Sequence, residues 1–167
     1  MGGATLLDIG GGIGAIHHEL LQEGAASAVH VDASAAYLEK AKGEAERRGH
    51  RDRVRFLHGD FVDIVGSVPQ ADVVTLDRVI CCYPDVERLV HLSAERSDRY
   101  YGLVYPRDSW WMRLAFPVPN LYFRARSCPF RIFLHPVARV DQLIRDCGFT
   151  EIFKKLTAVW LIALYRR

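Results

Sequence analysis

The sequence has no apolar run long enough to cross a membrane, and it has almost no net charge. A membrane-spanning helix needs roughly 18 or more consecutive apolar residues, and the longest apolar runs fall well short of that. The 167 residues carry a formal net charge of +2, which gives no reason to expect a nucleic-acid partner. The first residues, Met1 to Ala4, contain no basic segment of the kind that opens a signal peptide. We therefore expect a cytoplasmic protein with no membrane span, folded as one domain.

Cysteine is also scarce, and its spacing excludes two common uses. The thiols are at Cys81, Cys82, Cys128 and Cys147. None of them forms a C-x-x-C pair, and no histidine cluster accompanies them at zinc-site spacing. The pattern favours small buried thiols in a reducing compartment. It predicts no metal site.

What the sequence does contain is a glycine cluster directly after its first apolar run. Gly10, Gly11, Gly12 and Gly14 follow the run, and a helix-compatible segment comes next. Glycine lets the backbone turn sharply and leaves no Cβ to keep a ligand away. The unpaired N–H groups at the start of the helix favour phosphate or carboxylate groups. The cluster indicates a site for a nucleotide-like ligand, and a plain structural turn is the alternative.

Apolar β-type runs alternate with helical segments along most of the chain. The expected strands are residues 4–9, 28–32, 54–60, 71–77 and 100–105, and the expected helices are residues 13–22, 33–48, 61–65, 85–96 and 137–147. Residues 150–157 and 158–165 are two further β-type runs with almost nothing between them. This order predicts an α/β fold: a Rossmann-like, doubly wound sheet of seven strands with an antiparallel C-terminal hairpin.

Acidic residues stand at or near the ends of four expected strands. They are Asp8, Asp32, Asp60 and Asp77. Ligands of doubly wound sheets bind outside the carboxyl ends of the strands. We therefore expect these carboxylates to lie near one ligand, beside the glycine cluster.

The region at about 107–136 breaks the alternation. It is rich in aromatic residues and prolines, and it holds five arginines, Arg107, Arg113, Arg124, Arg126 and Arg131. No clean period is present, so we expect short helices and loops. We interpret this region as a substrate lid.

These features together resemble class I S-adenosylmethionine-dependent methyltransferases. The run from Asp8 to Gly14 matches the D-x-G-x-G-x-G loop of that family, and the step Gly59-Asp60-Phe61 matches its G-D-hydrophobic segment. The resemblance implies that S-adenosylmethionine is the cofactor and S-adenosylhomocysteine its product. The implied cofactor-binding residues are Asp8, Gly10, Gly11, Gly12, Gly14, Asp32, Ala33, Asp60, Phe61 and Asp77.

A finer resemblance connects the chain to the magnesium-protoporphyrin O-methyltransferase branch. It is carried by the run from Leu76 to Pro84 and by Phe133-Leu134-His135-Pro136. It implies methylation, favoured on oxygen, of a small apolar or aromatic acceptor, here a carboxylic acid. The arginines of the lid would suit such an acid, although they also fit the ordinary amphipathic cover of a lid. His135 is the candidate general base, and a histidine that only bonds the backbone is the alternative.

Two other functions stay open at this stage. Gly10 to Ala15 also fits G-x-G-x-x-A, and with Asp32 it would suit an NAD(P)-dependent oxidoreductase. Class I enzymes usually carry helices ahead of the first strand, so the chain could instead be a non-catalytic S-adenosylmethionine-binding module without that N-terminal cap. Exposed apolar surface at the cap position would favour a homodimer.

Overall fold

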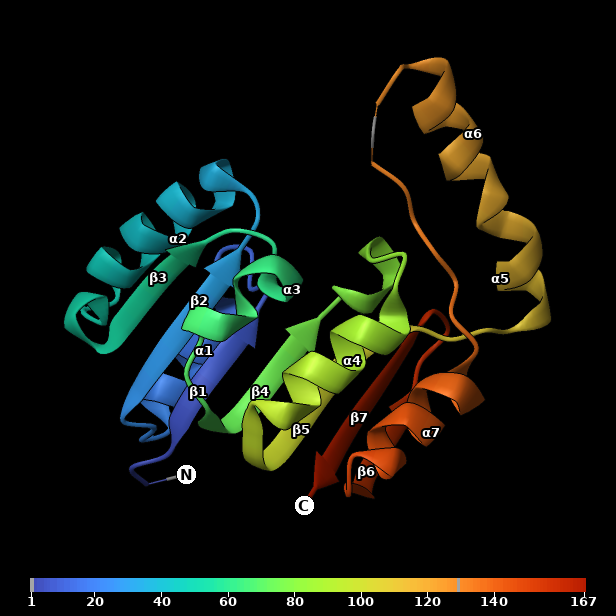
Figure 1. Ribbon diagram of the computed structural model, residues 1–167. Coiled ribbons are helices and arrows are strands. Elements are labelled where there is room, and N and C mark those ends of the chain that lie inside the picture. The colour runs from blue at the N-terminus through green and yellow to red at the C-terminus, as the bar shows by residue number, and fades with distance from the viewer. Residues whose placement is uncertain (1, 129) are drawn as a thin grey trace.

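The computed structural model describes residues 2–128 and 130–167. Within them, seven strands form one sheet in the order β3-β2-β1-β4-β5-β7-β6 (Figure 1). The strands are β1 Thr5–Ile9, β2 Ser27–Asp32, β3 Val54–His58, β4 Ala71–Asp77, β5 Ser97–Pro106, β6 Thr150–Leu156 and β7 Trp160–Arg166. The α-helices are α1 Ala15–Gln22, α2 Ala35–Arg47, α3 Phe61–Ile64, α4 Val86–Glu95, α5 Trp110–Ala115, α6 Pro117–Ala125 and α7 Val137–Asp146.

The pairing of the strands confirms the predicted fold class. Strands β1 to β5 pair in parallel, and β7 runs antiparallel to both β5 and β6. The C-terminal hairpin therefore closes one edge of the sheet, as the sequence predicts. Strand β5 is longer than expected because its backbone pairs with β4 on one side and with β7 on the other.

Alternation along the strands divides the interior into two apolar layers. Leu7 and Ile9 of β1 face the layer that contains α3, α4 and α7, whereas Leu6 faces the layer of α1. Figure 1 shows α4 and α7 in front of the sheet and α1 behind it. Successive side chains of a strand point to opposite faces. Asp8, between Leu7 and Ile9, therefore points toward α1.

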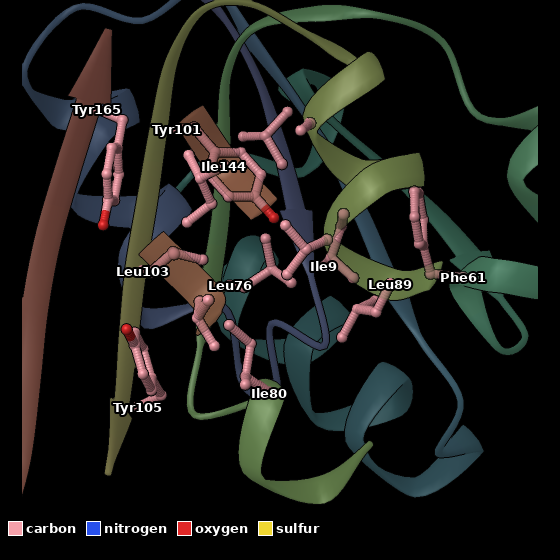
Figure 2. Close-up of a cluster of buried hydrophobic side chains, with 14 of the residues drawn as sticks. Ile9, Phe61, Leu76, Ile80, Leu89, Tyr101, Leu103, Tyr105, Ile144 and Tyr165 are labelled. Carbon is pink, nitrogen blue, oxygen red and sulfur yellow. The ribbon is translucent and has the colours of Figure 1, made fainter. Parts of the chain in front are cut away.

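The larger layer is closed by three tyrosines: the hydroxyl groups of Tyr101 and Tyr165 are paired, whereas that of Tyr105 has no partner among the described residues. Tyr101, Tyr105 and Tyr165 are almost completely buried (Figure 2). The Tyr101 hydroxyl lies 2.6 Å from Ser93 Oγ, and the Tyr165 hydroxyl donates to Asp141 Oδ1 at 3.0 Å. Paired hydroxyls let these large rings fill the core without an unsatisfied polar group at those positions.

Residues 107–128 and 130–136, which we call the arm, form the short helices α5 and α6 and a returning loop. The arm projects from the sheet beyond the carboxyl end of β5 (Figure 1). Trp110, Leu114, Val118 and Leu121 are each more than 60% exposed. Short helices and loops agree with the sequence prediction for this region. Among the described residues, no helix combines the length and the apolar character that crossing a membrane requires.

Candidate cofactor-binding site

A cavity of about 240 Å³ lies at the carboxyl ends of β1, β2 and β4, on the face of the sheet that carries α3 and α4. We call it the loop cavity. It is lined by Ile9, Gly10, Val31, Asp32, Ala33, Gly59, Asp60, Phe61, Val79, Cys82, Tyr83 and Leu89. Parallel strands that reverse their order at this point leave such a crevice. The predicted residues Gly10, Asp32, Ala33, Asp60 and Phe61 therefore meet around one space.

The glycine loop turns into this cavity through positions that only glycine fills easily. Gly10 has φ +61°, and a Cβ there would stand 2.5 Å from Val79 Cγ2. Gly12 has φ +57°, and its N–H donates to Asp32 Oδ2 at 3.0 Å. Left-handed backbone is costly for other residues. The loop is thus tied to the end of β2.

Asp32 is held in a fixed orientation at the rim of the cavity. Its second carboxylate oxygen, Oδ1, accepts from the N–H of Ser34 at 2.8 Å, and the residue is 8% exposed. Ser34 in turn caps α2 by accepting from the N–H of Tyr37. Each carboxylate oxygen has two lone pairs. Both oxygens of Asp32 can therefore accept one further hydrogen bond from a ligand.

Asp60 and Phe61 form the opposite wall. Asp60 caps α3 through Val62 N–H, at 2.9 Å, and accepts from the Tyr83 hydroxyl at 3.3 Å. Burial, reinforced by the Asp60 carboxylate, raises the pKa of Tyr83 to about 12. Tyr83 is therefore a neutral hydrogen-bond donor in this wall at physiological pH. Phe61 is 4% exposed and presents an apolar surface beside these polar groups.

The other predicted cofactor residues do not line the loop cavity. Gly11, Gly12 and Gly14 complete the loop, and Asp77 at the end of β4 is paired with Arg78 at 3.0 Å. Asp8 lies on the opposite face of the sheet. Its carboxylate accepts from Thr75 Oγ1 at 2.8 Å and lies 2.8 Å from His17 Nδ1.

The loop after β4 contributes more to the cavity than the sequence suggests. Val79, Cys82 and Tyr83 line it, together with Leu89 of α4. The thiols of Cys81 and Cys82 are 3.8 Å apart, and hydrogen bonding from Cys81 lowers the pKa of the exposed Cys82 to about 7. Apolar residues after a strand give no sequence signal of their own, so Val79 and Leu89 could not be identified in advance.

His135 reaches the rim of the cavity from the returning loop of the arm. Its Nε2 lies 3.0 Å from the backbone oxygen of Tyr83, and its ring stacks on Phe133 at 6.1 Å between centroids. Because a carbonyl oxygen only accepts, Nε2 carries the proton. The other nitrogen, Nδ1, is then an acceptor in the neutral ring. Both proposed uses of His135, as a base and as a backbone partner, are compatible with this geometry.

A second cavity, of about 860 Å³, lies within the arm. We call it the arm cavity. Its lining residues are Asp108, Arg113, Phe116, Pro117, Val118, Asn120, Leu121, Arg124, Ile132, Phe133, Leu134 and Pro136. Of the five arginines of the arm, Arg113 and Arg124 line this space. Arg107 and Arg131 donate to backbone carbonyls, and Arg126 lies over the ring of Tyr122.

The chain matches the model of one known protein family. The model of a family described as "Methyltransferase domain" matches residues 6–96, from the first strand to the end of α4. The chain belongs to this methyltransferase-domain family. The resemblance noted in the sequence is confirmed at the level of the family. A search of curated proteins found no match.

Solved structures with the same fold cover nearly the whole chain. The magnesium protoporphyrin IX methyltransferase of Synechocystis PCC 6803 with bound SAH matches with a TM-score of 0.81 and 20% sequence identity, over 99% of this chain and 75% of that one. A structure of the same enzyme with bound SAM matches with a TM-score of 0.77 and 19% identity, over 99% and 71%.

Other matching structures carry different activities in their names. An O-methyltransferase family 2 protein from Planctomyces limnophilus, in complex with apigenin, has a TM-score of 0.75 and 22% identity over 99% of this chain and 50% of that one. The [4+2]-cyclase SpnF has a TM-score of 0.75 and 13% identity over 99% and 75%. At such identities the likeness shows a shared fold, and a shared fold does not fix the reaction.

Proposed function

We propose that this protein is an S-adenosylmethionine-dependent methyltransferase that methylates a small apolar or aromatic acceptor, on oxygen. The observation that carries the proposal is the loop cavity, where the glycine loop, Asp32 and the Asp60–Phe61 pair meet in one space. Membership of the methyltransferase-domain family supports it, as do the matching structures with bound SAM and SAH.

Each wall of the loop cavity suits one part of the cofactor. The free lone pairs of Asp32 would accept from both ribose hydroxyls. Asp60 would accept from the exocyclic amine of adenine, and Phe61 and Ala33 would pack beside the ring. Gly10 to Gly14, with Asp77 at the end of β4, would receive the amino-acid portion. Asp8 would support the loop from the far face of the sheet.

A sulfonium methyl group is already electrophilic, so the protein mainly has to align it with the acceptor. We assign the acceptor to the arm, which would serve as a substrate lid. The arm cavity is mostly apolar, and Arg113 and Arg124 add positive charge. Arg113 is paired with Asp108 at 3.2 Å, which leaves Arg124 the better placed partner for an acidic group. A flat carboxylic acid with an apolar body fits this lining.

Binding measurements test the first half of the proposal. S-Adenosylhomocysteine should raise the melting temperature and bind with a measurable heat in isothermal titration calorimetry, and NAD should do neither. Stabilisation by NAD alone would contradict the proposal and favour an oxidoreductase. Turnover assays with cyclic tetrapyrrole acids, aromatic acids, phenols and amines then test the acceptor. Binding without turnover of any acceptor would favour a non-catalytic binding module.

His135 is our candidate for the general base, with Nδ1 as the accepting atom. The variant His135→Gln should lower kcat by roughly 10²-fold or more while the affinity for S-adenosylhomocysteine stays unchanged. The matched control is His91→Gln, because His91 lies on the exposed side of α4 and is paired with Glu95. A fall in kcat of less than threefold for His135→Gln would leave His135 as a backbone partner only.

A further inference from the structure

A buried group of histidines lies on the far face of the sheet, directly beneath the glycine loop. It consists of His17 and His18 from α1, His30 from β2 and His50 before β3, together with Asp8. Asp8, His17, His18 and His30 are fully buried, and His50 is 7% exposed. The proposed methyl transfer uses none of the four histidines. Buried ionisable groups of this kind need partners or a ligand.

Three of these side chains direct ligand atoms toward one point. His17 Nδ1 lies 2.8 Å from Asp8 Oδ2 and 3.4 Å from His30 Nδ1, and the three groups offer ligand atoms within 4.8 Å of one another. Thr75 Oγ1 donates to Asp8 Oδ1, which fixes the carboxylate with Oδ2 toward the histidines. A hydroxyl that orients a ligating carboxylate is a common feature of metal sites.

Protons alone do not satisfy this arrangement well. If His17 Nδ1 carries a proton, it donates that proton to Asp8 Oδ2. His30 Nδ1 then lies 3.4 Å from a nitrogen whose proton is already donated to the carboxylate. A cation bound between the two Nδ1 atoms and Oδ2 would satisfy all three ligand atoms together.

We propose that Asp8, His17 and His30 bind a divalent transition-metal ion, with Zn²⁺ as the best-suited ion. Imidazole nitrogen and carboxylate oxygen are both ordinary zinc ligands. Zn–N bonds of about 2.0–2.1 Å in a tetrahedron place neighbouring ligand atoms about 3.3–3.4 Å apart, which agrees with the separation of the two Nδ1 atoms. The ion replaces the proton between His17 and Asp8, and their separation widens from 2.8 Å.

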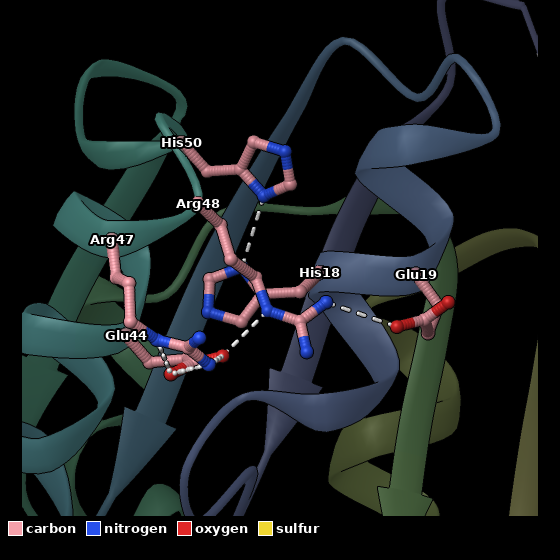
Figure 3. Close-up of polar contacts among 6 residues, drawn as sticks. All are labelled: His18, Glu19, Glu44, Arg47, Arg48 and His50. Atoms are coloured by element: carbon pink, nitrogen blue, oxygen red, sulfur yellow. Dashed lines mark hydrogen bonds and ion pairs between the residues drawn. The ribbon is translucent and has the colours of Figure 1, made fainter.

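The other two histidines of the cluster, His18 and His50, form a pair of their own. The Nδ1 atoms of His18 and His50 are 3.1 Å apart, so one proton between them satisfies both Nδ1 atoms (Figure 3). Arg48 lies beside His18, paired with Glu44 and Glu19, and joins α2 to α1 over the cluster (Figure 3). These ion pairs close the cluster toward solvent. The three proposed ligands are therefore shielded from solvent, each 0% exposed.

An ion at this place would hold the glycine loop. A Cβ on Gly11 would stand 2.5 Å from Asp8 Oδ2 and 2.8 Å from His30 Cε1, so the loop rests directly on two of the three ligands. Removing the ion should loosen the loop and weaken cofactor binding by roughly tenfold, which is within the usual range of coupling between two binding sites. This coupling rests on the proposed function, whereas the metal site itself does not.

Metal content tests the site directly. Full-length protein purified without an affinity tag that binds metals, then incubated with Zn²⁺ and desalted, should retain about one ion per chain by mass spectrometry. Co²⁺ in its place should give the visible absorption of a tetrahedral nitrogen–oxygen site. His17→Gln and His30→Gln should retain almost none, and the matched control His50→Gln should retain as much as the wild type. Equal retention by all three variants would overturn the proposal.

A measurement on the wild type covers the case in which the variants do not fold. Protein stripped with a strong chelator should melt at a lower temperature, and Zn²⁺ should restore the original value. Failure of folded wild-type protein to bind Zn²⁺ or Co²⁺ at micromolar concentration would overturn the proposal. Titration of S-adenosylhomocysteine into metal-stripped and metal-loaded protein separates the two proposals. If the protein binds S-adenosylhomocysteine but takes up no metal, only the metal site is contradicted. If it takes up metal but does not bind S-adenosylhomocysteine, only the cofactor assignment is contradicted.

Discussion

The loop cavity and the arm cavity are built in opposite ways. The loop cavity is assembled from strand ends of one sheet, and its polar groups are held by the backbone itself, as Asp32 is by Gly12 and Ser34. The arm cavity is enclosed by two short helices and a returning loop whose large apolar residues are mostly exposed. The first construction suits a ligand shared across a family, and the second suits an acceptor that differs between relatives. Four experiments test this contrast.

The largest effect is expected from Asp32→Ala. The substitution removes an acceptor for two loop N–H groups and, on our proposal, for both ribose hydroxyls. Charge-assisted hydrogen bonds contribute roughly 1.5–3 kcal/mol each, so the affinity for S-adenosylhomocysteine should fall about 100-fold or more. Isothermal titration calorimetry measures this affinity. The control is Asp52→Ala, since Asp52 is exposed and does not line the cavity. If the Asp32→Ala variant binds S-adenosylhomocysteine with an affinity within threefold of the wild type, the assignment of Asp32 is contradicted.

The next effect concerns the stability of the loop. Gly10→Ala places a methyl group against Val79 at a left-handed backbone position, and it should lower the free energy of unfolding by about 1–3 kcal/mol. Gly43→Ala is the matched control. Gly43 lies within α2 with open space around it, so alanine there should stabilise the protein by about 0.5–1 kcal/mol. Urea denaturation measures both, and equal stability of the two variants would show that the loop is not constrained.

A smaller effect, confined to the acceptor, is expected from the arm. Arg124→Gln should raise the KM for an acidic acceptor about tenfold, the value of one charged hydrogen bond, and leave the affinity for S-adenosylhomocysteine unchanged. Arg126→Gln is the control, because that guanidinium lies 5.6 Å over the Tyr122 ring and does not line the cavity. If Arg124→Gln weakened cofactor binding as well, the two cavities would not be independent.

The smallest effect is a chemical one at Cys82. Because its pKa is lowered to about 7, its reaction with iodoacetamide should speed up as pH rises through 7, ahead of the other thiols. Cys147, whose pKa is raised by burial, should react slowly at the same pH. Peptide mass spectrometry follows the labelling of each thiol. S-Adenosylhomocysteine should protect Cys82, which lines the loop cavity, and labelling unaffected by the ligand would place it outside the cofactor site.

Much of the fold could be predicted from local patterns in the sequence. The limits of β4 agree with the prediction at both ends, and α2 and α4 lie within the expected helices 33–48 and 85–96, with Ser34 and Asp85 as their N-caps. These features depend on neighbouring residues, through alternation and through side chains that bond nearby N–H groups. Strand β5 is longer than the predicted 100–105 because Ser97 pairs with Ala71 of β4 at one end and Pro106 pairs with Trp160 of β7 at the other.

The candidate site was predictable only in part. Strand-end residues such as Asp32 and Asp60 could be identified because parallel strands bring their carboxyl ends to one edge. Val79 and Leu89 could not, because an apolar side chain gives the same pattern whether it faces a cavity or the core. Tyr83 lines the cavity from the loop after β4, where its hydroxyl donates to Asp60 at 3.3 Å, a contact between residues 23 positions apart in the sequence.

The sequence by itself determined the order of the elements, the glycine loop and the acids around it. Each of these is set by short-range chemistry: alternation, capping and the freedom of glycine. The tertiary structure alone decided that Asp8, His17 and His30 meet under the loop, because no local pattern relates a strand, a helix and a second strand. It also decided which arginines of the arm line a cavity. Such meetings depend on how the helices pack on the sheet, and that packing is a property of the whole chain.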